Sequence, residues 1–286
     1  MRIFALKPDH FSYSDKEIKG GSKLLIPNAM EIKIPPYPNL IIRNENLKNS
    51  SIPTQKKDNS EGLSTQLIMM IPFNEHEHRV IRTRSISHKG NTYISALPNP
   101  VHLFLTLGVE NFEYSEQIKE TKFPKCGQAY GKDMFLLPIE ENGTHQCYND
   151  YIKYRSSSII MLVSSLEAFI NHAIPNDFIY RTSKKEYSKI EIESPKIIFR
   201  DKLEKVIPQY LQDEIFWDKH TAMKFTILGL YEIRKNLIHL KTNAANDLEA
   251  YFDSINEMLE LDLGSCVDSL INFMNIVKLD FVEFTL

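Results

Sequence analysis

One stretch of the chain, Arg234-Lys235-Asn236-Leu237-Ile238-His239, combines residue types that could act on a phosphate ester. A guanidinium can hold phosphate oxygens and stabilise the negative charge that builds up in a transition state. An imidazole titrates near neutral pH, so His239 could take or give a proton. RNA supplies its own nucleophile, the 2′-hydroxyl, so this pair would need no metal ion to cleave it. Asn236, three residues before His239, could orient the imidazole or contact the phosphate.

A second polar residue, Glu167, interrupts an apolar helical pattern. Four apolar residues share its face on an ideal helix: Ile160, Val163, Ile170 and Ile174. A carboxylate on such a face needs a partner, because an unpaired buried charge is costly or shifts its pKa. Two interpretations stay open. Glu167 and Arg234 form a buried ion pair that only stabilises the fold, or both side chains reach a shared cleft.

Spacing alone identifies an Arg-His motif only weakly, since Arg82 and His88 also match a loose version of it. That second match falls in a predicted strand. Arg82 and Arg84 would project from one face of the strand and could contact RNA phosphates. Lys235 and Lys241, within and just after the first match, are further candidates for RNA binding. A solvated sheet face is the alternative for the two arginines.

Metal binding has little support in the sequence. His76 and His78 would lie on the same side of a strand, but no third ligand is identifiable. Cys126, His145 and Cys147 could occupy three corners of a zinc site, although a fourth ligand is missing. The sequence contains no glycine-rich phosphate loop, nucleophile elbow or His-Glu-x-x-His motif. We therefore expect neither a metal nor another cofactor.

Helical periodicity dominates the chain from Tyr148 onward. Apolar residues at steps of three and four run from Ile152 to Ala173 and stop at Pro175. Further helices are expected from Ser194-Pro195 until a break at Pro208, and from Thr221 to Leu240. Another begins near Asn246 or Asp247, and after an interruption at Gly264 a last one runs through Val277. The pattern predicts a helical bundle.

Residues 1–147 show the shorter alternation and β-branched content that are typical of strands. The expected strands are Met30–Ile34, Leu40–Arg43, Leu67–Ile71, Arg79–Ile86, Thr92–Ala96 and Val101–Leu107. The fold class is therefore predicted as α+β, with a β-rich domain at 1–147 and an all-α bundle at 148–286.

Composition limits the function classes. The net charge of −3 divides into +2 for residues 1–147 (18 Lys and Arg against 16 Asp and Glu) and −5 for residues 148–286 (16 against 21). Any RNA contact must therefore be local. Three cysteines are too few for a disulfide framework, and no signal peptide or membrane span is recognisable. These features predict a cytoplasmic protein without a membrane partner.

The Ser-Leu-Glu-Ala-Phe-Ile-Asn helix followed by a helix ending in Arg-x4-His resembles the HEPN superfamily, over roughly residues 148–280. Many members are metal-independent endoribonucleases that act as homodimers. The resemblance implies catalytic roles for Arg234 and His239, with Glu167 matching an acidic residue on the earlier helix. Family members often have Asn, Asp or His directly after the arginine, where this chain has Lys235.

The function expected from these features is an endoribonuclease of HEPN type, related by analogy to toxin–antitoxin systems or phage defence. Its partners would be RNA, a second copy of the chain, and an antitoxin or other protein. The alternative is a HEPN-like dimerisation or partner-binding module without catalysis. A helical bundle unrelated to the family is the third possibility.

Overall fold

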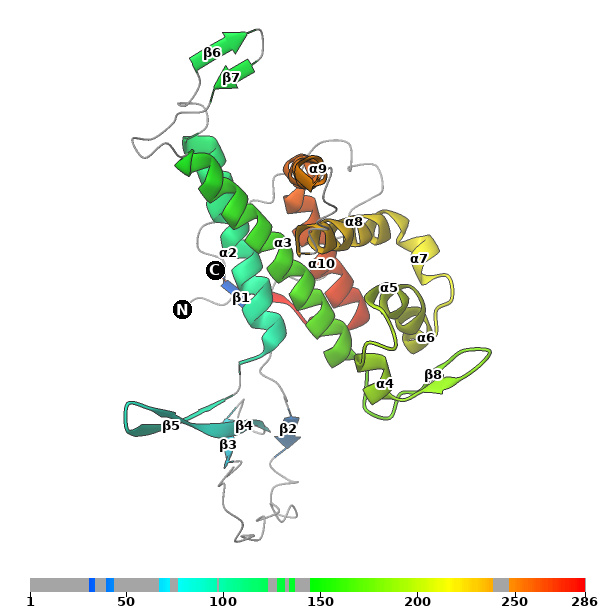
Figure 1. Ribbon diagram of the computed structural model, residues 1–286. Helices are drawn as coiled ribbons and strands as arrows, with labels where there is room; N and C mark the ends of the chain where they lie inside the picture. Colours follow the sequence, from blue (N-terminus) through cyan, green and yellow to red (C-terminus); the bar gives the residue numbers. More distant parts are fainter. Residues whose placement is uncertain are drawn as a thin grey trace. The chain divides into compact units, whose positions relative to one another are not determined.

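The computed structural model describes residues 31–33, 40–43, 67–72, 77–96, 98–122, 128–131, 134–136, 145–238 and 247–285. They form two compact units, of which one spans Ile34–Asn99 and the other contains the strand at 31–33 and everything from Pro100 onward. Helices and antiparallel sheets place the protein in the α+β class (Figure 1). The units divide at 33/34 and 99/100, whereas we expected a boundary at 147/148.

The smaller unit is an antiparallel sheet in the order β2-β4-β3, with β5 also paired to β4. Its strands are β2 (Leu40–Arg43), β3 (Leu67–Pro72), β4 (Glu77–His88) and β5 (Asn91–Ala96). Lys89 and Gly90 both have positive φ angles, which fits the tight turn between β4 and β5. All four strands were predicted. The predicted strand at 30–34 is also present as β1 (Glu31–Lys33), but it pairs with β10 (Glu283–Thr285).

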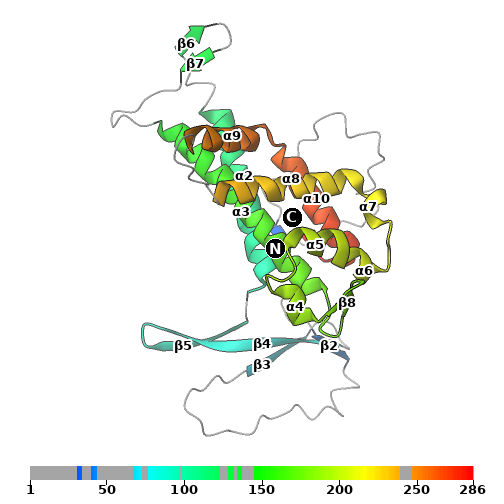
Figure 2. The ribbon, with the colours of Figure 1, turned by 45° about the vertical axis from the view of Figure 1, so that its right-hand side comes forward.

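The predicted strand at 101–107 is wrong, because these residues begin the helix α2 (Pro100–Thr121). The buried residues Val101, Leu105, Gly108 and Val109 follow steps of four and three, so the helical period is present over the longer window. The helix α3 (Gln146–Ala173) runs antiparallel beside α2 (Figures 1 and 2). This pairing places α2 in the helical unit.

Most of the remaining helices fall where helices were expected, with different ends, but the two short ones at 189–193 and 216–219 were not predicted. In chain order they are α4 (Lys189–Glu193), α5 (Phe199–Asp201), the π-helical segment η3 (Lys202–Val206), α6 (Ile207–Leu211), α7 (Phe216–Lys219), α8 (Thr221–Ile238), α9 (Asp247–Glu260) and α10 (Leu263–Val277). Two-stranded pairs β6 (Gln128–Gly131) with β7 (Met134–Leu136), and β8 (Tyr180–Arg181) with β9 (Glu186–Tyr187), complete the described elements.

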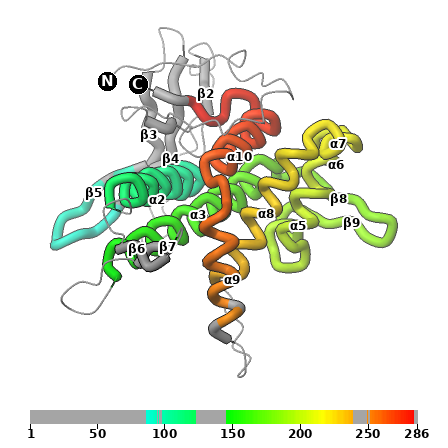
Figure 3. The backbone as a smooth tube through the Cα atoms, turned by 90° about the horizontal axis from the view of Figure 1, so that it is seen from above, coloured from blue at the N-terminus to red at the C-terminus, as the bar shows by residue number. Residues whose placement is uncertain are grey.

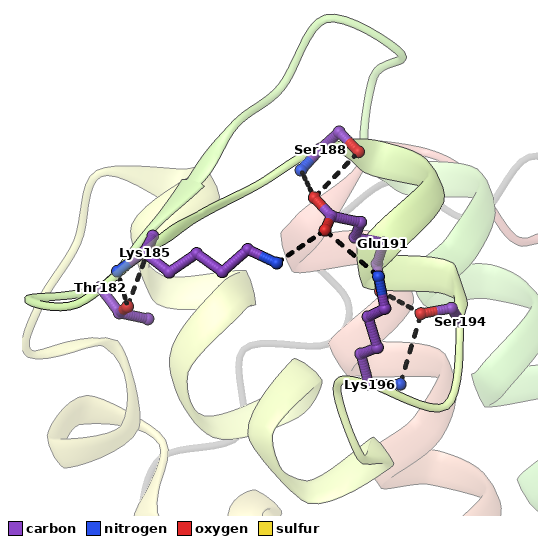
Figure 4. A network of polar contacts seen from close by, with 6 residues as sticks. All are labelled: Thr182, Lys185, Ser188, Glu191, Ser194 and Lys196. Atoms are coloured by element: carbon purple, nitrogen blue, oxygen red, sulfur yellow. Dashed lines mark hydrogen bonds and ion pairs between the residues drawn. The ribbon is translucent and has the colours of Figure 1, made fainter.

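Two predicted helix boundaries are wrong. The helix expected from Ser194 begins instead at Phe199, after Ile198 and without a side-chain cap. Ser188 precedes α4, and its backbone N–H and hydroxyl both donate to Glu191 in the surface network of Figure 4. Ser194, expected to start a helix, instead ends α4. Asp262 caps α10 by accepting from the Ser265 N–H at 3.1 Å, so Gly264 lies inside the first turn.

The expected break at Pro208 is also wrong, since the helix continues through this residue. The Ile207 N–H bonds to the Lys202 carbonyl, five residues back, in the π-helical register. The corresponding donor for the Leu203 carbonyl would be Pro208, which has no N–H. The indole Nε1 of Trp217 donates to that carbonyl at 2.9 Å instead. A side chain from α7 thus satisfies the group that the proline leaves without a partner.

The core of the larger unit lies between α3, α8 and α10, which are neighbours in Figures 2 and 3. Phe169, Phe273 and Trp217 meet there, with ring centroids 6.0 Å apart for Phe169–Phe273 and 5.8 Å for the stacked Trp217–Phe273 pair. Burial of these large side chains supplies the main stabilising term for the bundle. Within the described residues, no helix has both the length and the apolar character required to cross a membrane.

Candidate functional site

The helix α8 carries the arginine of the predicted motif and fixes its direction. Ile227, Leu230 and Ile233 are buried against the neighbouring helices, which anchors the C-terminal half of α8. Arg234 lies one turn beyond Leu230 and is half-buried as a consequence. Its position at the rim of the core follows directly from the apolar spacing of α8.

The Arg234 guanidinium is incompletely satisfied within the chain. Its Nε atom is buried and has no hydrogen-bond partner among the residues that the structure describes. A buried donor without a partner costs about 1–3 kcal/mol, more when the group is charged. Native proteins contain few such groups, and each asks for a specific explanation. A bound anion would satisfy this donor if the side chain turned outward, since the Nε atom has less than 1 Å² of accessible surface in its present position.

Glu167 does not provide that partner. It is half-buried on α3, and none of the ion pairs between described residues joins it to Arg234. Its electrostatic partner is Lys202 of η3: burial lowers the pKa of Lys202, and the charge of Glu167 opposes that shift. Lys202 Nζ also donates to Asn171 Oδ1 at 3.3 Å. The proposed buried ion pair between Glu167 and Arg234 is therefore not formed.

The residues that follow Arg234 point outward. Lys235 is exposed and its Nζ lies 2.9 Å from Glu232 Oε2, a contact that raises the pKa of the lysine. Asn236 is also exposed. The α8 helix is described to Ile238, and both His239 and Lys241 lie outside the described residues. The structure thus brings Arg234, Lys235 and Asn236 to one end of α8 and leaves the position of His239 a prediction.

Arg82 and Arg84 are placed on the same face of β4, as the strand period requires. Arg82 is registered opposite Ile68 of β3, and Arg84 opposite Ser95 of β5. Their side chains fall outside the described part of the structure. They belong to the smaller unit, whereas Arg234 belongs to the larger one.

Other ionisable groups of the bundle are poorly suited to catalysis. His172 Nε2 lies 3.3 Å from Lys278 Nζ, and burial, assisted by the charges of Lys278 and Lys189, lowers the pKa of His172 to about 4. The imidazole is therefore neutral at pH 7 and a weak proton acceptor. Burial raises the pKa of Cys266 to about 12, which excludes a reactive thiolate. The part of the chain that is described contains no cluster of three metal-ligating side chains.

Sequence reasoning missed a second group of residues beside α8. Phe199 of α5 stacks on Tyr231 of α8 with ring centroids 4.4 Å apart. Glu204 forms two ion pairs. Its Oε1 atom lies 3.0 Å from Lys224 Nζ of α8, and its Oε2 atom lies 3.5 Å from Arg200 Nε. The i,i+4 spacing of Arg200 and Glu204 indicated a helical surface pair. No sequence signal indicated that this pair lies against the motif helix.

Comparison of the chain with models of known protein families, with curated protein sequences and with solved structures gave no significant match.

Proposed function

We propose that this chain is a metal-independent endoribonuclease of HEPN type. The observation that carries the proposal is the Arg234 guanidinium, which is held half-buried at the end of α8 with its Nε unpartnered among the described residues. A group of this kind is suited to a phosphodiester, whose oxygens could accept from the fork. The absence of a Glu167 ion pair to Arg234 weighs against a purely structural role for the arginine.

The proposed reaction is an intramolecular transfer. The 2′-hydroxyl oxygen attacks the adjacent phosphorus while His239 accepts its proton, and the bond from phosphorus to the 5′-oxygen breaks. The leaving 5′-oxygen takes up a proton, so that the products are a 2′,3′-cyclic phosphate and a 5′-hydroxyl end. Arg234 stabilises the charge that develops on the phosphoryl oxygens. Asn236 would assist His239, and Glu167 would take the place of the acidic residue that the family carries on the earlier helix.

By the same resemblance, the active form would be a homodimer in which the Arg234 and His239 residues of both protomers line one site. The cellular role would be that of a cytoplasmic toxin or phage-defence nuclease, with an antitoxin or another protein as partner. The smaller unit, with Arg82 and Arg84 on β4, would bind RNA or that partner.

A second candidate function is a HEPN-like dimerisation or partner-binding module without catalysis. One observation favours it. The residue after Arg234 is Lys235, where family members often have Asn, Asp or His, and its ammonium pairs with Glu232 on its own helix. If Asn236 does not substitute for that helper, the fold would remain and the chemistry would be lost.

The two candidates are separated by RNA cleavage in the presence of EDTA. Purified full-length protein should cut single-stranded RNA, and the new ends should carry a 2′,3′-cyclic phosphate. His239→Ala and Arg234→Ala should each abolish cutting, while Lys219→Ala, which alters an exposed lysine paired with Asp213, should leave it unchanged. Equal cutting by wild type and His239→Ala would remove the proposed reaction. A dimer without cleavage in any variant would favour the binding module.

A further inference from the structure

The α5–η3 segment lies antiparallel along α8, with two contacts that fix its alignment. The Phe199–Tyr231 stack joins one end, and the Glu204–Lys224 ion pair joins the other. As the residue number rises from 199 to 204 on one side, it falls from 231 to 224 on the other. Figures 2 and 3 both show α5 beside α8.

This alignment brings Arg200 to the end of α8 that carries the candidate site. Arg200 follows Phe199 directly, and Lys235 lies one turn beyond Tyr231, next to Arg234. The charge of Arg200 lowers the pKa of Lys235, against the larger effect of Glu232. Arg200 thus adjoins Phe199 in the chain, while Arg234 and Lys235 lie within one turn of Tyr231, so both elements carry cationic residues beside the stack.

Both outer cations are held by ion pairs that a phosphate could replace. The Arg200 side chain is 52% exposed and lies 3.5 Å from Glu204, while Lys235 is 49% exposed beside Glu232. Exposed pairs of this kind contribute little to stability. Arg155 shows the opposite case, since it is buried and bonds to two backbone carbonyls and to Glu116. Exposed cations such as Arg200 and Lys235 can therefore exchange their partners at low cost, whereas the buried Arg155 cannot.

We propose that Arg200 and Lys235 bind the backbone phosphates that flank the phosphate held by Arg234, and so position single-stranded RNA along the α5–α8 surface. This inference rests on the proposed function for the identity of the ligand. A single strand fits because its flexible backbone can follow a surface of about one helical turn on each element. The net charge of −5 over residues 148–286 makes such a local cluster necessary for any polyanion contact.

The test uses the full-length protein and a short RNA in which every 2′-hydroxyl is methylated, so that binding is measured without cleavage. Fluorescence anisotropy of the labelled RNA gives Kd at several salt concentrations. Arg200→Ala should weaken binding about tenfold. It should also reduce the slope of log K against log salt by about 0.7, the value for one lost contact to a single strand. Arg200→Lys should recover most of the affinity.

Arg181→Ala is the matched control. Arg181 is an exposed arginine whose Nε lies 2.9 Å from Glu186, on the β8–β9 pair. The Arg181→Ala variant should bind the RNA with the Kd of the wild type and with the same slope of log K against log salt. Thermal melting of each variant checks that the Phe199–Tyr231 stack and the fold persist.

Equal losses in Arg200→Ala and Arg181→Ala, or no binding by the wild type, would overturn the inference. Failure of the proposed function has a different signature: the methylated RNA binds with the expected Arg200 dependence, but unmodified RNA is not cut. Conversely, cleavage that depends on His239 while Arg200→Ala binds normally would retain the nuclease and remove the role of Arg200.

Discussion

Gly108 of α2 lies so close to Leu162 of α3 that a Cβ atom on the glycine would lie 2.8 Å from Leu162 Cγ. The same atom would lie 3.1 Å from the Leu162 backbone nitrogen, so a side-chain rotation alone would not relieve the crowding. The Gly108 carbonyl also accepts from Ser158 Oγ at 2.6 Å. The close approach of α2 and α3 depends on the missing side chain.

Gly108→Ala should therefore destabilise the protein, although alanine is the better helix former by about 1 kcal/mol. Overpacking typically costs about 1–3 kcal/mol, so after the gain in helix propensity we expect a net loss of up to about 2 kcal/mol in the free energy of unfolding from urea titration. Gly229→Ala is the control, because Gly229 is an exposed residue of α8 with open space around its Cβ position. It should gain about 0.5–1 kcal/mol. An increase in the free energy of unfolding for both Gly108→Ala and Gly229→Ala would contradict the proposed close packing.

Arg155→Ala should cause a larger loss. The Arg155 side chain is 3% exposed, and it donates to the carbonyls of Met258 and Leu261 and to Glu116 Oε1. Its removal leaves the two carbonyls at the end of α9 without this donor and Glu116 of α2 without its buried partner, so we expect a loss of about 3–5 kcal/mol in unfolding experiments. Lys153→Ala, which breaks an exposed pair with Asp150, should change stability by less than about 1 kcal/mol. Similar values for both variants would show that Arg155 is dispensable.

Asp268 should give the stability a distinctive pH dependence. Burial, reinforced by the charge of Asp262, raises the pKa of Asp268 to about 6 from its ordinary value of 3.8. The folded state therefore holds a proton that the unfolded state has released between these values, and the contribution of Asp268 to stability is lost as pH rises through about 6. Asp268→Asn should remove this slope and raise the free energy of unfolding at pH 7 by about 1–2 kcal/mol, allowing for partial solvent screening. An unchanged profile in chemical denaturation from pH 4 to pH 8 would refute the assignment.

Arg234→Met should separate stability from activity. The methionine side chain removes the unpartnered Nε and preserves most of the apolar stem, so the free energy of unfolding should stay within about 1 kcal/mol of wild type or rise. EDTA-resistant RNA cleavage should be lost in the same variant. A destabilisation of several kcal/mol would indicate instead that the guanidinium is a structural member of the core.

The fold could be predicted from the sequence wherever the spacing of apolar residues kept one period, helical or alternating, along a whole helix or strand. The strands β2 to β5 and the long helices α3 and α8 follow such patterns. The error at 101–107 arose because a short window contains both alternation and helical spacing, and the helical period is recognisable only when the window extends past Gly108. The continuation through Pro208 could not be predicted, since it depends on the indole of Trp217, which approaches from another helix.

For the candidate site, the apolar spacing of α8 indicated that Arg234 lies on the side of the helix that carries Ile227 and Leu230, and Arg234 is half-buried. The effect of Glu167 on the pKa of Lys202 could not be inferred, because the sequence does not show that η3 lies beside α3. Arg200 was missed because the helical pattern indicates only that this residue is exposed. Its place beside α8 follows from the stack of Phe199 on Tyr231, which the sequence does not reveal.

The contact of Trp217 with Leu203 has a practical consequence. Trp217 is the only tryptophan of the chain, its indole is 7% exposed, and it joins α7 to η3 and stacks on Phe273 of α10. Its emission is therefore an intrinsic optical reporter of one junction in the bundle. Opening of that junction exposes the indole to water and shifts the spectrum to longer wavelengths, so each substitution above can be followed without an attached dye.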